Sequence, residues 1–238
     1  EVMPLEAGGE GVGVCEGWWG DAGGGAGQGA GARRARAGVD ACGGRARGAG
    51  GGVAVRGGAG GGARGAAAAS AGAGGWVGGA AARAGAAGVQ GSETDVLGRF
   101  ERVVEEYDPD VLVRVTADCP LLSPVVLDRV VKRLQQSGAD YSSNILERTF
   151  PRGLDVEAFT ADSFATVAEE ATEPHHREHV TPYYHEQAER FERVSVTSCE
   201  VFAEPWLHER TDLRLTLDEP ADYEPLLRVY AGVAHDGL

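Results

Sequence analysis

The spacing of apolar side chains predicts alternating helices and strands after Gly91. Between residues 94 and 107 apolar residues recur every three or four positions, as in a helix with one buried face that Thr94 is placed to cap. Over 111–117 apolar and polar residues alternate singly, as in a strand. The predicted order is helix 94–107, strand 111–117, a helix from Ser123-Pro124 to a C-terminal Gly138, strand 140–144, strand 154–159, helix 161–171, a helix over 175–187 broken at Pro182, strand 194–197, strand 212–217 and helix 221–230.

This alternation predicts an α/β domain with a mostly parallel sheet. In open sheets of this kind ligands bind beyond the carboxyl ends of the strands. Asp118 follows the first predicted strand and Asp218 follows the last one, each close to a proline. Two carboxylates so placed could hold one Mg²⁺ and leave its other positions to water and phosphate. A helix N-cap is the alternative role for either acid alone.

Residues 1–91 differ in composition from the rest of the chain. They hold 33 of the 38 glycines, and most of the remainder is Ala and Arg. The tract contains no Lys, Ile, Asn, Thr, Phe, Tyr or His, and its apolar residues follow no regular period. So much glycine makes ordering entropically costly, with few large side chains to offset the cost. We therefore predict a low-complexity segment at 1–90 and a folded domain at 91–238.

Two interpretations of the glycine-rich tract remain open. Gly, Ala and Arg have GC-rich codons and residues with AT-rich codons are missing, which is typical of out-of-frame translation of a GC-rich gene. A natural disordered tail is the alternative. An RNA-binding tail fits less well, because its stacking aromatics would be only Trp18, Trp19 and Trp76. We favour the first interpretation, which predicts that residues 1–91 do not encode the N-terminal part of the functional domain.

The rest of the chain is strongly acidic. Residues 1–91 carry 8 arginines against 6 acidic residues, whereas residues 92–238 carry 14 basic and 30 acidic residues. This charge argues against nucleic acid or an anionic membrane as a partner, because like charges repel. It is equally typical of an ordinary acidic enzyme and of proteins from salt-loving organisms.

The cysteines and the N-terminus indicate a cytoplasmic protein. The 4 cysteines show neither a CxxC pair nor zinc-ligand spacing, so we expect free thiols. Cys119, beside Asp118, is expected to be a packed thiol, because no histidine lies close in sequence to activate it. No basic segment followed by an apolar one opens the chain, and no apolar run reaches 18 residues.

Five segments together resemble, in order and spacing, the cytidylyltransferases that activate sugars as CMP conjugates. They are GSETDVLGRF, VRVTADCPLLSP, SNILERTFPRGLDVEAF, REHVTPYYHE and LRLTLDEPADYE. The similarity is to the branch of spore-coat polysaccharide biosynthesis protein F, which is related to the CMP-acylneuraminate and CMP-Kdo synthetases. It covers Gly91 to about Tyr230.

The resemblance implies a Rossmann-like, GT-A-type nucleotidyltransferase fold, the nucleotide-diphospho-sugar transferase fold, incomplete at the N-terminus. It implies an enzyme of surface polysaccharide biosynthesis that couples CTP to a sugar acid with Mg²⁺ and releases pyrophosphate; a homodimer is compatible with it. Asp118 matches the metal- and substrate-positioning aspartate. Asp218 matches the second magnesium aspartate of the motif D-T-P-E-D, with Glu219 in place of threonine. The candidate substrate contacts are Arg114, Asn144, Arg152, Asp155, Glu157, Arg177, Glu178 and His179.

Ordinary strand-edge charges and turn contacts are the alternative roles for several of these residues, such as Asn144 and Asp155.

One family motif is also missing. The family opens with a strand and a loop of the form A-R-x-G-S-x-R-L-P-G-K that holds the CTP phosphates, and nothing in residues 1–91 matches it. We therefore expect the chain as written to be inactive or unable to bind CTP normally. A glycosyltransferase of the same fold class and a non-catalytic nucleotide-sugar-binding or scaffold protein are the alternative functions.

Three histidines lie at helical spacing and could bind zinc: His175, His176 and His179. No third type of ligand follows them at a fixed spacing, and the family that the chain resembles uses no zinc. The sequence therefore favours a solvated helix face with a single substrate or dimer contact.

Overall fold

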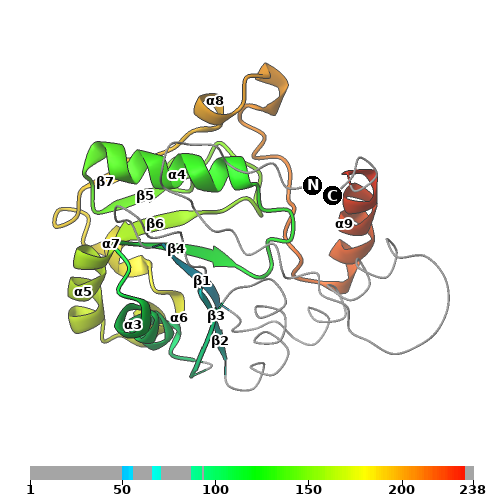
Figure 1. The fold of residues 1–238 in the computed structure, drawn as a ribbon. Helices are drawn as coiled ribbons and strands as arrows, with labels where there is room; N and C mark the ends of the chain where they lie inside the picture. Colours follow the sequence, from blue (N-terminus) through cyan, green and yellow to red (C-terminus); the bar gives the residue numbers. More distant parts are fainter. Residues whose placement is uncertain (1–49, 56–65, 71–86, 93, 234–238) are drawn as a thin grey trace, which may run out of the picture.

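The computed structural model describes residues 50–55, 66–70, 87–92 and 94–233 of the chain (Figure 1). No helix in these ranges is long and apolar enough to cross a membrane. The elements are β1 (Gly50–Val55), β2 (Ala66–Ser70), β3 (Ala87–Gly91), α3 (Val96–Tyr107), β4 (Val111–Thr116), α4 (Pro124–Ser137), β5 (Tyr141–Ser143), β6 (Glu157–Thr160), α5 (Ala161–Glu170), α6 (Pro174–His179), α7 (Pro182–Glu186), β7 (Arg193–Ser195), α8 (Ser198–Val201), the short 3₁₀ helix η2 (Pro205–Leu207) and α9 (Pro220–Val233).

The main sheet is mixed, with the strand order β1-β4-β6-β5-β7. β6 runs antiparallel to both β4 and β5, and β7 is parallel to β5. The prediction of a mostly parallel sheet is therefore wrong. Helix α4 carries the chain from β4 to the start of β5, as in a parallel unit. The next connection, residues 144–156, contains no helix, so β6 returns in the opposite direction and inserts between β4 and β5.

As a result, several segments that carry candidate site residues share one edge of the sheet. β4, β5 and β7 end there and β6 begins there, because Arg114 of β4 and Ser143 of β5 both lie opposite Glu157 of β6. We call this side the carboxyl edge of the sheet. It is where ligands bind in open α/β sheets.

Alternate strand residues face two separate cores, because successive side chains of a strand point to opposite faces. On one face Val111 and Val113 pack against α4. On the other face Leu112 and Phe159 pack against residues of α3, α5 and α7. Figure 1 shows α4 on one side of the sheet and α3 with α5 on the other. Full burial of each such side chain contributes about 1.5–3 kcal/mol, so these two layers hold the strand ends in place.

Several helix boundaries follow the sequence signals. Ser123 and Pro124 begin α4, and Gly138 ends it in the left-handed conformation with φ of 71°. The helix predicted over 175–187 is broken, as expected, into α6 and α7. The break includes Val180, which is buried and has φ of 69°.

The N-cap of α3 differs from the prediction. Asp95, not Thr94, is the capping residue, and its carboxylate accepts the Gly98 N–H at 3.0 Å. The same carboxylate is also paired with Arg177 of α6. The prediction of Thr94 is wrong because Asp95 caps the helix and binds a neighbouring helix at once.

The predicted strand 212–217 is also wrong. The segment forms a single parallel bridge, between Arg214 and Arg152, with the Leu215 N–H donating to the Arg152 carbonyl at 2.7 Å. The next residue of the partner, Gly153, has φ of 100° and turns the chain away. A ladder cannot extend past that turn.

The sequence predicts a domain boundary near Gly91. Most of the tract before it lies outside the described residues, whereas most of the chain after it is described. Within the tract the structure describes β1, which pairs with β4, and the separate parallel pair of β2 and β3. Whether the tract is a natural tail or an out-of-frame product stays a prediction.

Candidate active site at the carboxyl edge

The two aspartates singled out in the sequence lie on neighbouring stretches of backbone. Asp118 follows β4, and Asp218 lies two residues before α9. The N–H of Leu217 donates to the carbonyl of Asp118 at 2.8 Å. The backbone that carries Asp218 therefore runs beside Asp118, although the two residues are 100 positions apart.

Asp218 is held by its own segment. Its Oδ2 accepts the hydroxyl of Thr216 at 2.9 Å and forms an ion pair with Arg214. The Asp222 carboxylate accepts the backbone N–H groups of Asp218 and Glu219, at 2.9 Å each. These contacts use Oδ2 of Asp218 and leave Oδ1 for another partner. Sequence reasoning missed Arg214, although its alternate spacing with Thr216 and Asp218 in extended backbone was a usable signal.

Asp118 is partly buried and carries the other carboxylate of the site. Its contact with the Cys119 thiol is long, at 3.7 Å. Burial, reinforced by the negative charge of Asp118, raises the pKa of Cys119 to about 12, which agrees with a packed, unreactive thiol. The donors offered by Asp118 and Asp218 are carboxylate oxygens, the type that Mg²⁺ prefers, so the residues present fit that ion. That their two carboxyl groups share one ion stays a prediction.

Gly153 sets how closely the Asp218 segment can lie to the loop before β6. A Cβ at this position would lie 2.6 Å from the carbonyl carbon of Leu215 and 2.9 Å from the nitrogen of Thr216. Its φ of 100° also favours glycine. Arg152, beside it, is exposed and makes its bridge to Arg214 through the backbone, which leaves the guanidinium at the surface.

The loop between β5 and β6 is shaped by three of the polar residues that follow β5. Asn144 is fully buried; its side-chain nitrogen donates to the Leu154 carbonyl at 2.7 Å and its oxygen accepts the Val156 N–H at 2.8 Å. Arg148 makes two hydrogen bonds to Asp155, at 2.9 and 3.1 Å. Turn contacts thus account for Asn144, and substrate contacts by Asn144 or Asp155 stay predictions.

Arg114 and Glu157 form a nearly buried ion pair at the same edge, 2.5 Å apart. The Tyr141 hydroxyl donates to the other oxygen of Glu157 at 2.6 Å. His185 Nε2 lies 3.4 Å from that hydroxyl. Burial alone would raise the pKa of Glu157, but the Arg114 guanidinium and the neighbouring donors lower it to about 2. Glu157 is therefore ionised at neutral pH. Tyr141 and His185 were missed because they come from β5 and α7, and only the fold brings them together.

The candidate residues of the REHV segment lie on α6. Arg177 makes two hydrogen bonds to Asp95, both at 2.8 Å, and one to Glu101 at 3.1 Å. These contacts join α6 to α3 and its cap, not to the carboxyl edge. Glu178 and His179 are exposed. Roles for these three candidates in substrate binding stay predictions.

Comparisons with known proteins agree with this geometry. Residues 80–231 match the family described as Cytidylyltransferase. An uncharacterised protein of Methanocaldococcus jannaschii is 35% identical over 140 residues, which cover 59% of this chain and 54% of that protein. The spore coat polysaccharide biosynthesis protein SpsF of Bacillus subtilis is 30% identical over 142 residues, covering 59% and 55% of the two chains. The structure of a cytidylyltransferase from Leptospira borgpetersenii matches with 28% identity and a TM-score of 0.59 over 67% of this chain and 64% of that one.

The helix-covered mixed sheet, with acidic residues at its carboxyl edge, is a nucleotidyltransferase fold of the nucleotide-sugar type. More particularly, the chain belongs to the cytidylyltransferase family, which confirms the resemblance found in its five motifs. The chain spans about half the length of the curated relatives it matches.

Proposed function

We propose that this chain is a cytidylyltransferase that joins CTP to a sugar acid, giving a CMP-sugar and pyrophosphate for surface polysaccharide biosynthesis. The observation that carries the proposal is the hydrogen bond from Leu217 to Asp118, because it brings the segments of two acidic residues to the edge where α/β sheets bind ligands. The name of the Bacillus subtilis relative, a spore coat polysaccharide biosynthesis protein, supports the class of pathway.

In this reaction an oxygen of the sugar acid bonds to the α-phosphorus of CTP, and the bond from that phosphorus to pyrophosphate breaks. Such chemistry depends mainly on positioning and on neutralising charge. Asp118 and Asp218 would hold Mg²⁺, which supplies charge neutralisation for the triphosphate and the leaving pyrophosphate. Arg214 and Thr216 orient the Asp218 carboxylate. The exposed guanidinium of Arg152 is suited to the carboxylate of a sugar acid.

We further propose that the 238-residue chain turns over CTP poorly. Residues 1–91 contain no match to the family loop that holds the triphosphate, and an enzyme without that binding energy loses kcat/KM. The test compares this chain with one in which another reading frame of the gene, encoding an R-L-P-G-K loop, supplies the first 91 residues. Pyrophosphate release is measured with CTP, Mg²⁺ and a panel of sugar acids. We expect Mg²⁺-dependent release from the restored chain and little from the present one.

The aspartates are tested in the restored chain. Asp118→Asn and Asp218→Asn are each expected to lower turnover by about 10²–10³-fold or more with the unfolding transition unchanged, because the ion loses a charged ligand. Asp128→Asn is the matched control, since that carboxylate is partly buried, like that of Asp118, and pairs with Lys132 one turn later in α4. Robust turnover by the present chain would refute the defect that we assign to residues 1–91. Full activity of both aspartate variants would refute the site.

A further inference from the structure

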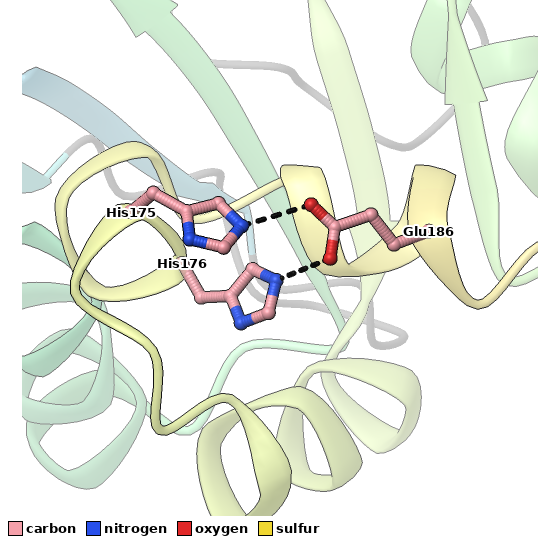
Figure 2. Close-up of side chains that lie close together, drawn as sticks. All are labelled: His175, His176 and Glu186. Atoms are coloured by element: carbon pink, nitrogen blue, oxygen red, sulfur yellow. Dashed lines mark hydrogen bonds and ion pairs between the residues drawn. The ribbon is translucent and has the colours of Figure 1, made fainter.

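A second group of possible metal ligands, which does not include the two aspartates, is formed by residues of α6 and α7. Figure 2 shows His175 and His176, neighbours on α6, both turned toward Glu186 on α7. His175 Nε2 lies 2.9 Å from Oε1 of Glu186, and His176 Nε2 lies 2.7 Å from Oε2. One ligand atom from each residue lies within 4.8 Å of the others. The third ligand, which the sequence did not reveal, is therefore supplied by the next helix.

The geometry of this group suits a small cation with nitrogen and oxygen ligands. Zinc bonds of about 2.0–2.2 Å to imidazole nitrogen and carboxylate oxygen require ligand atoms roughly 3–3.6 Å apart in a tetrahedral site. The two nitrogen–oxygen separations, 2.9 and 2.7 Å, lie just below that range, and all three ligand atoms lie within 4.8 Å of one another. His176 is nearly buried and its ring meets that of Tyr183 edge-on at 5.3 Å, so this ligand is held in place. His175 and Glu186 are about half exposed, at 50% and 48%, which leaves a path for entry from solvent.

The backbone between the two helices is constrained in the arrangement that makes the group. The turn from α6 to α7 passes through Val180, a buried β-branched residue at φ of 69°. Such a conformation costs of order 1–3 kcal/mol and persists only where the surrounding packing imposes it. Val180 belongs to the core that also includes Tyr183 and Tyr184 of α7. The approach of Glu186 to α6 is therefore a property of the packed fold rather than of two free side chains.

We propose that His175, His176 and Glu186 form a binding site for a divalent transition-metal ion, of which Zn²⁺ is the expected one, with a fourth position open to water. Two imidazoles and one carboxylate match the ligand set of open zinc sites. The nitrogen ligands distinguish it from the proposed Mg²⁺ site, since Mg²⁺ prefers oxygen ligands. The proposal does not depend on the cytidylyltransferase activity.

One feature of the site limits the expected affinity. Metal-bound histidines usually donate their second ring N–H to a carboxylate, a carbonyl or water, and loss of that partner typically costs about 10–100-fold in affinity. Within the described ranges, Nδ1 of His176 is buried and has no hydrogen-bond partner. We therefore expect weaker binding than at a closed structural zinc site.

The test uses the full 238-residue chain without a histidine tag, freed of metal by a chelator and dialysed. Zn²⁺ is titrated in competition with a chromophoric chelator, in excess Mg²⁺ so that oxygen-only sites are occupied. The variants are His175→Ala and Glu186→Gln, chosen because both side chains are half exposed and their loss should leave the fold intact. The matched control is His179→Ala, an exposed histidine of the same helix.

We expect the wild-type chain to bind one Zn²⁺. The affinity should fall at least about tenfold, or binding should be lost, in each of the two variants, and it should be unchanged in His179→Ala. Co²⁺ substitution gives a second readout, because a site of two imidazoles and one carboxylate shows visible absorption without the near-ultraviolet band of a thiolate ligand. That absorption should disappear in Glu186→Gln. Equal Zn²⁺ affinity in the wild type and both variants, or no bound Zn²⁺ at all, would overturn the proposal. A thiolate band that survives both substitutions would assign the metal to cysteine and overturn it as well.

Discussion

Gly153→Ala tests whether the close approach of the loop before β6 holds the Asp218 segment in place. A non-glycine residue in the left-handed region costs about 1–2 kcal/mol. The added Cβ would also lie 2.6 Å from the carbonyl carbon of Leu215 and 2.9 Å from the nitrogen of Thr216, and neither backbone atom can rotate away. Relieving such an overlap costs about 1–3 kcal/mol. Alanine returns about 0.4–1 kcal/mol by restricting the unfolded chain, so we expect a net loss of about 3 kcal/mol.

Gly138→Ala is the control for the backbone contribution. Gly138 has φ of 71°, but a Cβ there would have no heavy atom within 4 Å. We expect a loss of about 1 kcal/mol, from the left-handed conformation alone. Both losses are measured by denaturant unfolding, with the slope checked for an unchanged transition. In the frame-restored chain Gly153→Ala should also lower turnover, because Asp218 moves, whereas Gly138→Ala should not. Equal losses of stability in the two variants would refute the steric argument.

Three further results are expected. First, the pKa of Glu157 is lowered from 4.5 to about 2 on folding, so its carboxylate contributes stability above pH 4.5 that is lost as the pH falls toward 2. The difference in unfolding free energy between the wild type and Glu157→Gln, on the order of 3 kcal/mol, should therefore close between pH 4.5 and 2. A difference that does not change with pH would contradict this. A double-mutant cycle between Arg177 and Asp95 should give a coupling of about 0.5–1 kcal/mol in unfolding free energy, and zero coupling would show that their pairing is incidental. In native chain treated with iodoacetamide, mass spectrometry should find exposed Cys199 alkylated and buried Cys119 protected until the chain unfolds; equal labelling of both would contradict the raised pKa and burial of Cys119.

Sequence reasoning worked best where a structural feature depends on neighbouring residues. The ends of α4 follow from Ser123, Pro124 and Gly138, because capping and left-handed backbone are decided within one turn of a helix. The break between α6 and α7 was predicted from Pro182 for the same reason. The N-cap of α3 was predicted one residue too early, at Thr94. No local pattern shows that Asp95 is also bound by Arg177, which lies far along the chain.

Strand pairing was predicted less well, because it depends on segments that are distant in sequence. The apolar pattern located β4, β5 and β7, but it carried no information on the direction of β6. The run 212–217 alternates like a strand, yet its partner turns away at Gly153 after one bridge. A period of two residues shows that a segment can pair, whereas its neighbours decide whether it does.

The sequence by itself determined the family of this protein and the placement of Asp118 and Asp218 beside regular elements, since motifs and apolar periods are local properties of the chain. Only the tertiary structure decided which side chains meet. It placed the Asp218 segment against the backbone of Asp118 and enclosed Glu157 beside a guanidinium and a tyrosine hydroxyl. It also turned Glu186 onto two histidines of the preceding helix. These contacts depend on the packing of two cores and on left-handed backbone at Gly153 and Val180, which no local pattern of side chains encodes.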